Sequence, residues 1–225
     1  MSNKPIAAIA LALAATCGMT GMAIAADALP KVTMMVGGID KQIYLEYQLA
    51  QSLGMFQKYG IDMQLSTEQA GGVGAEDAVV SGQVDMAGAW YVHTIDFQQK
   101  GKDVTNIVQL AVAPGERIMC ATDSNVKTPA DWKGKSVGVT DIGSGTDDLV
   151  SYVSTRAGLA PKDYTKIGAG AGQTMIAALK FKKAVCGITS QPTVNALEKL
   201  KIAYSAVDLS TGQGVQKWLG GDYPA

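Results

Sequence analysis

Segments with helical and extended periodicity alternate along this chain, and the alternation restricts the fold more than any other feature of the sequence. Apolar residues at positions 32–36 and 61–65 follow the pattern of short strands. Between them, positions 43–53 repeat apolar side chains at helical spacing, with Asp40 expected as the N-cap and Gly54 as the C-terminal stop. An alternation of this kind is typical of α/β proteins with a largely parallel sheet.

The alternation continues through two units of similar construction. It predicts further helices over 75–81, 146–153, 175–179 and 192–200, and further strands over 84–89, 107–111, 117–122, 136–140, 184–188 and 204–207. The glycine loop 71–74, its helix and the strand after it are echoed by the glycine loop 168–172 and the elements that follow it. We therefore expect two α/β lobes, although coincidence between two common units would give the same echo. Residues 26–113 are assigned to lobe 1, 114–208 to lobe 2 and 209–225 to a segment that returns towards lobe 1.

The first 25 residues have the features of an export signal. Lys4 provides a short positive start, residues 6–15 form an unbroken apolar run, and residues 23–25 give the small-x-small pattern that signal peptidase accepts. We expect cleavage after this pattern and a periplasmic mature protein. Two alternatives stay open. The segment could remain as a membrane anchor, since it carries no charge after Lys4, or Cys17 could be lipidated, although the threonine before it disfavours lipidation.

Charge and cysteine content narrow the function classes. Removal of residues 1–25 takes away one lysine and no acid, which leaves a net charge of about −2 and implies no basic surface for nucleic acid.

Apart from Cys17, the chain contains Cys120 and Cys186, which could form one disulfide in an oxidising compartment or remain as two buried thiols. His93 is the only histidine, so we expect no metal site and no catalytic histidine relay, and we interpret it as a surface residue at a helix start.

Three stretches of the chain resemble the substrate-binding proteins of nitrate, sulfonate and taurine importers, a family with relatives that bind thiamine precursors. In residues 54–62 a helix end leads into a strand, residues 78–87 contain a Gly-Gln-Val-Asp strand start, and residues 128–139 lead into the second lobe. The resemblance covers essentially the whole mature chain. It implies the type II periplasmic binding fold, with a ligand cleft between two α/β lobes. It also implies a monomer without a cofactor that delivers a small, anionic ligand to the membrane subunits of an ABC importer.

Two departures from the family pattern affect these expectations. Where family members often carry an acid in a Gly-x-Val-Asp-Ala turn of the second lobe, this chain has Lys182–Cys186, so a closing contact based on that acid is in doubt. The sequence ends at Ala225, where such proteins return to the first lobe and add further helices. We expect it to be a fragment whose first lobe exposes apolar surface.

The loops that follow strands are expected to form the ligand site, because ligands of open α/β sheets bind at the carboxyl ends of strands. The loop Gly143–Thr146 is the strongest candidate, since Ser144, Gly145 and Thr146 place two hydroxyls and free backbone N–H groups at a helix start that suits an acidic group. Across the cleft, we expect Gly38 to offer its backbone and Lys41 a positive charge. Ordinary turn and capping roles are the alternatives for both loops.

Other candidates are weaker. Trp90 and Tyr91 could form a flat apolar wall or simply belong to the core, Gln191 could bring an amide into the cleft or merely start a helix, and Gly72 lies in the first glycine loop. Two acidic residues after Thr146 could oppose a highly charged anion and could also meet an amine, so a zwitterionic ligand stays possible.

Two other function classes are considered. A thiamine-pyrimidine precursor synthase shares the fold but uses clustered cysteines and histidines, which this chain lacks, and no Gly-x-Ser-x-Gly nucleophile motif is present. A ligand-sensing regulatory domain would need an attached effector segment, and none is visible. We therefore expect a binding protein and no enzyme.

Overall fold

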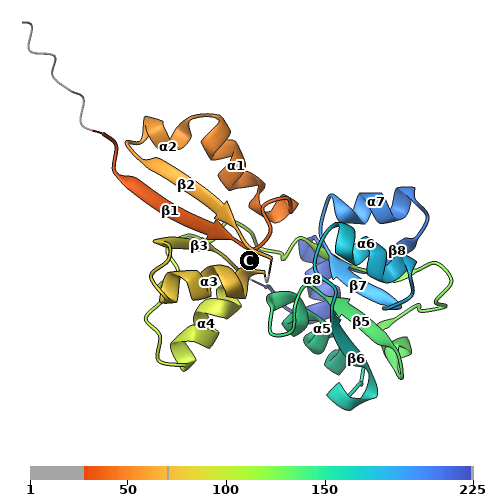
Figure 1. The fold of residues 1–225 in the computed structure, drawn as a ribbon. Coiled ribbons are helices and arrows are strands. Elements are labelled where there is room, and N and C mark those ends of the chain that lie inside the picture. The colour runs from red at the N-terminus through yellow and green to blue at the C-terminus, as the bar shows by residue number, and fades with distance from the viewer. Residues whose placement is uncertain (1–27, 70, 224–225) are drawn as a thin grey trace, which may run out of the picture.

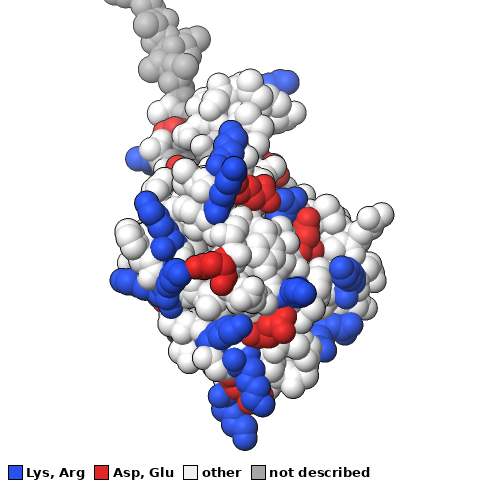
Figure 2. All heavy atoms as spheres, turned by 90° about the vertical axis from the view of Figure 1, so that its right-hand side faces the viewer, with Lys and Arg blue, Asp and Glu red and all other residues white. Residues whose placement is uncertain are grey.

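The chain folds into two α/β lobes, as the sequence predicted (Figure 1). The computed structural model describes residues 28–69 and 71–223, so the expected export signal and its cleavage site lie outside the described residues. No helix of the described part is long and apolar enough to cross a membrane. On the side that lobe 2 presents in Figure 2, Lys and Arg are interspersed with Asp and Glu, without a continuous surface of one sign.

Lobe 1 is built on a parallel sheet in the order β2-β1-β3. Its strands are β1 (Lys31–Val36), β2 (Asp62–Thr67) and β3 (Met86–Gly88). Its helices are η1 (Gln42–Tyr44), α1 (Leu45–Ser52), α2 (Met55–Lys58), α3 (Gly72–Val80) and α4 (Tyr91–Gln99). Helices α1 and α2 lie on one side of the sheet and α3 and α4 on the other (Figure 1), so both faces of β1 are covered and Met34 and Val36 are buried.

Lobe 2 contains a mixed sheet in the order β6-β5-β7-β4-β8. The strands are β4 (Glu116–Ala121), β5 (Ser136–Val139), β6 (Thr165–Gly168), β7 (Cys186–Thr189) and β8 (Ala203–Leu209). The helices are η2 (Pro129–Trp132), α5 (Gly145–Arg156), η3 (Pro161–Asp163), α6 (Gln173–Lys180), α7 (Thr193–Lys199) and α8 (Gly212–Leu219). Strand β4 is antiparallel to both β7 and β8, whereas β5 is parallel to β6 and β7.

Side chains of β4 pack into two hydrophobic cores, because successive residues of a strand point to opposite faces of the sheet. Ile118 and Cys120 pack in the cluster that includes α5 and α8, and Met119 packs in the cluster that includes α6 and α7. Strand β4 is therefore buried on both faces. Since it begins directly after the segment that joins the lobes, its first residue lies at the junction of the lobes.

The internal echo seen in the sequence corresponds to a repeated structure. In lobe 1, β2 is followed by a glycine loop, α3 and β3; in lobe 2, β6 is followed by a glycine loop, α6 and β7. In each lobe the strands before and after this unit pair in parallel with the same middle strand, β1 or β5. The turns after the helices also agree, because Gln83 N–H donates to the Ala78 carbonyl as Lys183 N–H donates to the Ala178 carbonyl. Gly71 and Gly172, the N-cap residues of α3 and α6, thus occupy equivalent positions, although residues 72–74 already belong to α3.

Three expectations need correction. The predicted strand 107–111 forms no strand and pairs with none among the described residues, and Ile107 and Val108 are exposed. Asp40 does not cap a helix, because the chain first turns into η1 and the N-cap position falls on Lys41. The segment 209–225 does not simply return to lobe 1. Leu209 ends β8, and α8 places Val215 and Leu219 in the lobe 2 core before the chain reaches lobe 1 at its end.

Cys120 and Cys186 form a disulfide. Cys120 on β4 lies directly opposite Cys186 on β7, with an S–S distance of 2.03 Å, and both residues are fully buried. The structure thereby decides between the two alternatives that the sequence left open. The bond joins neighbouring strands in the middle of the lobe 2 sheet and closes a loop with a sequence separation of 66.

Candidate ligand-binding site

A small cavity lies where loops of the two lobes meet. Its volume is about 10 Å³, which is room for about one water molecule. The lining residues come from the loops after β1, β2, β3 and β5 and from the start of β4: Lys41, Ile43, Tyr44, Gly71, Gly72, Trp90, His93, Glu116, Thr140, Ser144, Gly145 and Thr146. The carboxyl ends of four parallel strands therefore converge on one point, and in this structure the lobes are closed upon it.

Six of the residues singled out in the sequence line this cavity: Lys41, Gly72, Trp90, Ser144, Gly145 and Thr146. Gly38 lies just outside, beneath the aliphatic part of the Lys41 side chain. Tyr91 and Gln191 line a different and larger cavity. The candidate residues thus divide between two neighbouring cavities, six in the inner one and two in the outer one.

The hydroxyls of Ser144 and Thr146 are engaged inside the protein. Thr140 N–H donates to Thr146 Oγ1 at 2.8 Å, Ser144 Oγ donates to the Asp141 carbonyl at 2.7 Å, and the two hydroxyl oxygens are 2.8 Å apart. With Ser144 donating to Asp141, Thr146 donates to Ser144, so both hydroxyl hydrogens are used. These side chains shape the loop, and the groups left for a ligand are backbone N–H groups.

The first turn of α5 leaves two such N–H groups free. Asp147 and Asp148 N–H both donate to the Ser144 carbonyl, whereas the described residues contain no acceptor for the N–H groups of Gly145 and Thr146. These two N–H groups lie at the positive end of a 12-residue helix dipole, which favours an acidic group.

The acidic residues that follow Thr146 do not leave an uncompensated negative charge in the cavity. Asp147 forms an ion pair with Lys166 and accepts the Gly143 N–H at 2.8 Å. Asp148 faces away from the cavity towards α4, where burial and the charges of Asp96 and Asp147 raise its pKa to about 6.

The Trp90 ring covers the start of α5. A methyl group at Gly145 would lie 2.3 Å from Trp90 Cε3, so only a glycine lets the two lobes approach this closely. Trp90 is 8% exposed and also packs edge-on against Tyr223, with ring centroids 6.0 Å apart. It therefore both lines the cavity and belongs to the core, and it contacts α5 from lobe 1.

A second close approach shapes the lobe 1 side of the cavity. A Cβ atom on Gly37 would lie 2.1 Å from the Gly71 carbonyl carbon. The backbone after β1 therefore touches the backbone after β2, and a side chain at Gly37 would push the two loops apart.

Sequence reasoning did not assign the other six residues of the cavity to the site: Ile43, Tyr44, Gly71, His93, Glu116 and Thr140. His93 was interpreted as a surface residue, but it is only 1% exposed, and burial lowers its pKa to about 4. It is buried because α4 packs its first turn against Gly72 and Gly145, two positions without side chains. The packing of a helical histidine against glycines that are distant in the sequence leaves no pattern that a single sequence reveals. Glu116 had a signal, its position directly after the Pro114–Gly115 crossing.

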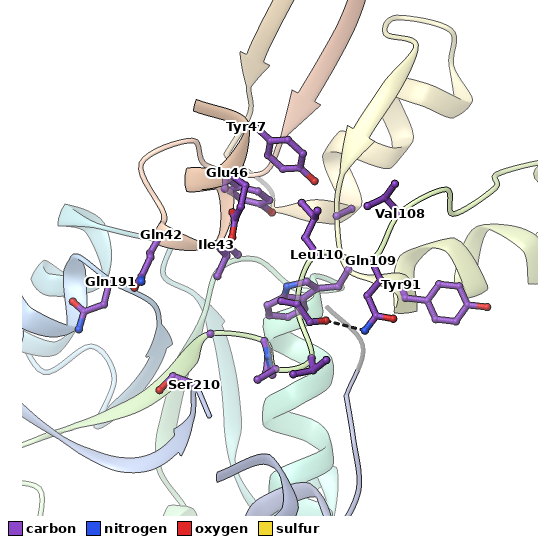
Figure 3. Close-up of a pocket in the computed structure, with 18 of the residues that line it drawn as sticks. Gln42, Ile43, Glu46, Tyr47, Tyr91, Val108, Gln109, Leu110, Gln191 and Ser210 are labelled. Atoms are coloured by element: carbon purple, nitrogen blue, oxygen red, sulfur yellow. Dashed lines mark hydrogen bonds between the residues drawn. The ribbon is translucent and has the colours of Figure 1, made fainter. Parts of the chain in front are cut away.

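A larger outer cavity of about 1140 Å³ adjoins the inner one (Figure 3). Its walls include Gln42, Tyr47, Tyr91, Gln191 and the extended segment 108–115. Gln191 does not direct a free amide oxygen into it, because Oε1 accepts the Asn195 N–H at 3.1 Å and the backbone carbonyl accepts the Gln42 N–H at 3.0 Å. The latter hydrogen bond links the two lobes.

The described residues contain no group of three or more His, Cys, Asp and Glu side chains arranged to hold a metal ion.

Comparison with known families decides the relationship of this chain. A family model described as NMT1/THI5 like matches residues 44–211, about three quarters of the sequence. The chain belongs to the NMT1/THI5-like family. A comparison with curated proteins finds no match.

Solved structures agree with this NMT1/THI5-like assignment. A protein from Bordetella bronchiseptica RB50 has 31% sequence identity and a TM-score of 0.78, with 86% of this chain and 61% of that chain covered. The alkanesulfonate-binding protein SsuA from Xanthomonas axonopodis pv. citri, bound to MOPS, has 19% identity and a TM-score of 0.64, with 87% and 64% covered. The periplasmic nitrate-binding protein NrtA from Synechocystis PCC 6803 has 18% identity and a TM-score of 0.60, with 79% and 51% covered. The last two show the fold alone. The chain therefore spans less than two thirds of the length of each of these proteins.

Proposed function

We propose that this NMT1/THI5-like chain is the ligand-capturing part of an extracytoplasmic solute-binding protein that delivers a small acid to an ABC importer. The observation that carries the proposal is the cavity between the lobes, where Lys41 from lobe 1 faces the free N–H groups of Gly145 and Thr146 from lobe 2. Sulfonate, nitrate and carboxylate groups all fit such donors. The names of SsuA and NrtA, which bind alkanesulfonate and nitrate, support the same ligand class.

Capture requires the lobes to open and close. The inner cavity has room for about one water molecule, so a ligand enters only when Trp90 separates from α5. Closure then covers the ligand with groups from both lobes, including the hydrogen bond from Gln42 to Gln191. Hinged closure around a ligand is a common device of two-lobed binding proteins.

The synthase alternative gains no support from the residues described. The two cysteines of the mature chain are bonded to each other in the core of lobe 2, and His93 has neither cysteine beside it in the inner cavity. The enzyme chemistry considered from the sequence needs clustered thiols and imidazoles, so binding without catalysis is the function that we propose.

A panel of ligands tests the proposal by thermal unfolding. Nitrate, alkanesulfonates, carboxylates and zwitterionic acids are added separately to the mature protein, and a true ligand at a hundred times its dissociation constant stabilises the folded state by about 2.7 kcal/mol. The proposal fails if only compounds without an acidic group produce a shift.

Closure over the ligand predicts a strong effect of Gly145→Ala. The added methyl group would collide with Trp90, hold the lobes apart and weaken binding of the panel ligand by at least about tenfold, a loss of about 1.4 kcal/mol measured by calorimetry. Gly212→Ala is the matched control, because Gly212 is likewise the first residue of its helix and a methyl group there meets nothing within 4 Å. Equal affinities of both variants would contradict closure.

The periplasmic location that we propose rests on the first 25 residues and on the periplasmic proteins with this fold. Mass spectrometry of protein expressed with its own N-terminus should find Ala26 first. An intact Met1 in the membrane fraction would support the anchor, and a diacylglyceryl group on Cys17 would support the lipoprotein.

A further inference from the structure

Glu116 is a buried carboxylate without a hydrogen-bond donor. It is the first residue of β4, its exposed fraction is 0%, and neither carboxylate oxygen has a partner among the described residues. Buried polar groups are almost always hydrogen-bonded, because an unpaired carboxylate loses its hydration without compensation. A side chain that breaks this rule inside a ligand cavity calls for a functional explanation.

The groups around Glu116 do not supply the missing donor. Lys41 is the cation that lowers the pKa of Glu116, but it forms no ion pair with it within 4 Å in the described structure. Burial and, after it, the charge of Glu116 raise the pKa of Tyr44, yet no hydrogen bond joins the two side chains. His93, the third titratable neighbour in the cavity, has its Nδ1 unpaired. Burial is the dominant influence on the carboxyl and raises the pKa of Glu116 to about 7.

The backbone holds this carboxylate in place. Glu116 pairs with Leu209 of β8, and β4 is a central strand with neighbours on both sides. The side chain therefore does not depend on a mobile loop, and opening of the lobes leaves its attachment to the lobe 2 sheet unchanged. A preorganised acceptor of this kind suits recognition, because little ordering is needed when the ligand arrives.

We propose that Glu116 accepts hydrogen bonds from an amino or amidino group of the ligand, so that the cleft selects small acids that also carry an N–H donor. This inference rests on the proposed function and adds a second point of recognition to it. The acidic group of the ligand binds to Lys41 and to the N-terminus of α5. Its nitrogen binds to Glu116, which lines the same cavity. A simple anion such as nitrate would leave Glu116 unpaired and would add a second negative charge beside it.

Matched pairs of ligands test this selection by calorimetry. The probes are taurine against ethanesulfonate, β-alanine against propionate, and 4-aminobenzoate against benzoate, measured with the mature protein at pH 8. A hydrogen bond to a charged group predicts that the amino member of at least one pair binds between about ten- and a hundredfold more tightly than its partner. Glu116→Gln should reduce that ratio to near one, whereas Glu46→Gln, at an exposed position lining the outer cavity, should leave it unchanged.

The pH dependence provides a readout that a merely structural role would not change. A carboxyl with a pKa of about 7 is ionised at pH 8.5 and protonated at pH 5.5, so the affinity for the amino acid probe should fall by about 30-fold over that range. Glu116→Gln should abolish the dependence while retaining Lys41, Tyr44 and His93, the other titratable groups of the cavity.

The outcomes separate the two proposals. Equal affinities within every pair that binds, or an unchanged ratio in Glu116→Gln, would overturn the role of Glu116 and leave the proposed function standing. Failure of all six probes and of nitrate to bind would overturn the proposed function and this inference with it.

Discussion

Reduction of the Cys120–Cys186 disulfide is expected to lower the free energy of unfolding by about 4 kcal/mol. The bond closes a loop with a sequence separation of 66, and a cross-link of that length removes a corresponding amount of chain entropy from the unfolded state. The measurement is denaturant unfolding of the mature protein with and without a reductant.

The double variant Cys120→Ala/Cys186→Ala is the control for this experiment. It should unfold at the same denaturant concentration with and without reductant, and it should be less stable than the oxidised parent. A parent protein that shows two free thiols by mass spectrometry and no response to reductant would contradict the disulfide.

The second large effect concerns the pH dependence of stability at Glu116. Burial raises its pKa from 4.5 in the reference state to about 7 in the folded protein, so the folded state holds this proton more tightly than the unfolded state does. The stabilisation is complete below pH 4.5 and is lost as the pH rises through 7. Relative to Glu116→Gln, the parent without ligand should therefore lose about 3 kcal/mol of unfolding free energy between pH 4.5 and pH 8.

Chemical denaturation at a series of pH values measures this difference. Subtraction of the Glu116→Gln curve from the parent curve cancels the titration of every other group that both proteins share. Glu46→Gln, a change of the same chemistry at an exposed position, should show no such divergence from the parent. A constant difference between parent and Glu116→Gln over the whole range would show that Glu116 is not buried as an unpaired acid.

Local patterns in the sequence predicted most of the fold because strand and helix periodicities reflect which faces are buried. The pattern of residues 32–36 and 61–65 predicted β1 and β2, and the glycine loops marked the equivalent starts of α3 and α6. The failure at 107–111 has a physical reason. Its apolar residues have the composition of a strand, but a strand needs a pairing partner, and none lies beside it among the described residues.

The site was predicted less completely than the fold. Glycines and hydroxyls at the ends of strands predicted loops that do lie together around the inner cavity, where Gly145 meets Trp90. The roles of Ser144 and Thr146 differ from expectation, because their hydroxyl groups form hydrogen bonds with the backbone and with each other. Whether a hydroxyl faces a ligand or its own loop depends on backbone geometry that a sequence pattern does not encode. The burial of Glu116 likewise depends on how two lobes close.

Amide hydrogen exchange with and without the tightest ligand of the panel tests the central claim most directly, namely that a small acid binds between the lobes. The account predicts increased protection in both lobes at once, at residues 38–44 and 90–94 of lobe 1 and at 116–118 and 144–148 of lobe 2. Protection confined to one lobe, or centred on the outer cavity at residues 108–115, would contradict it.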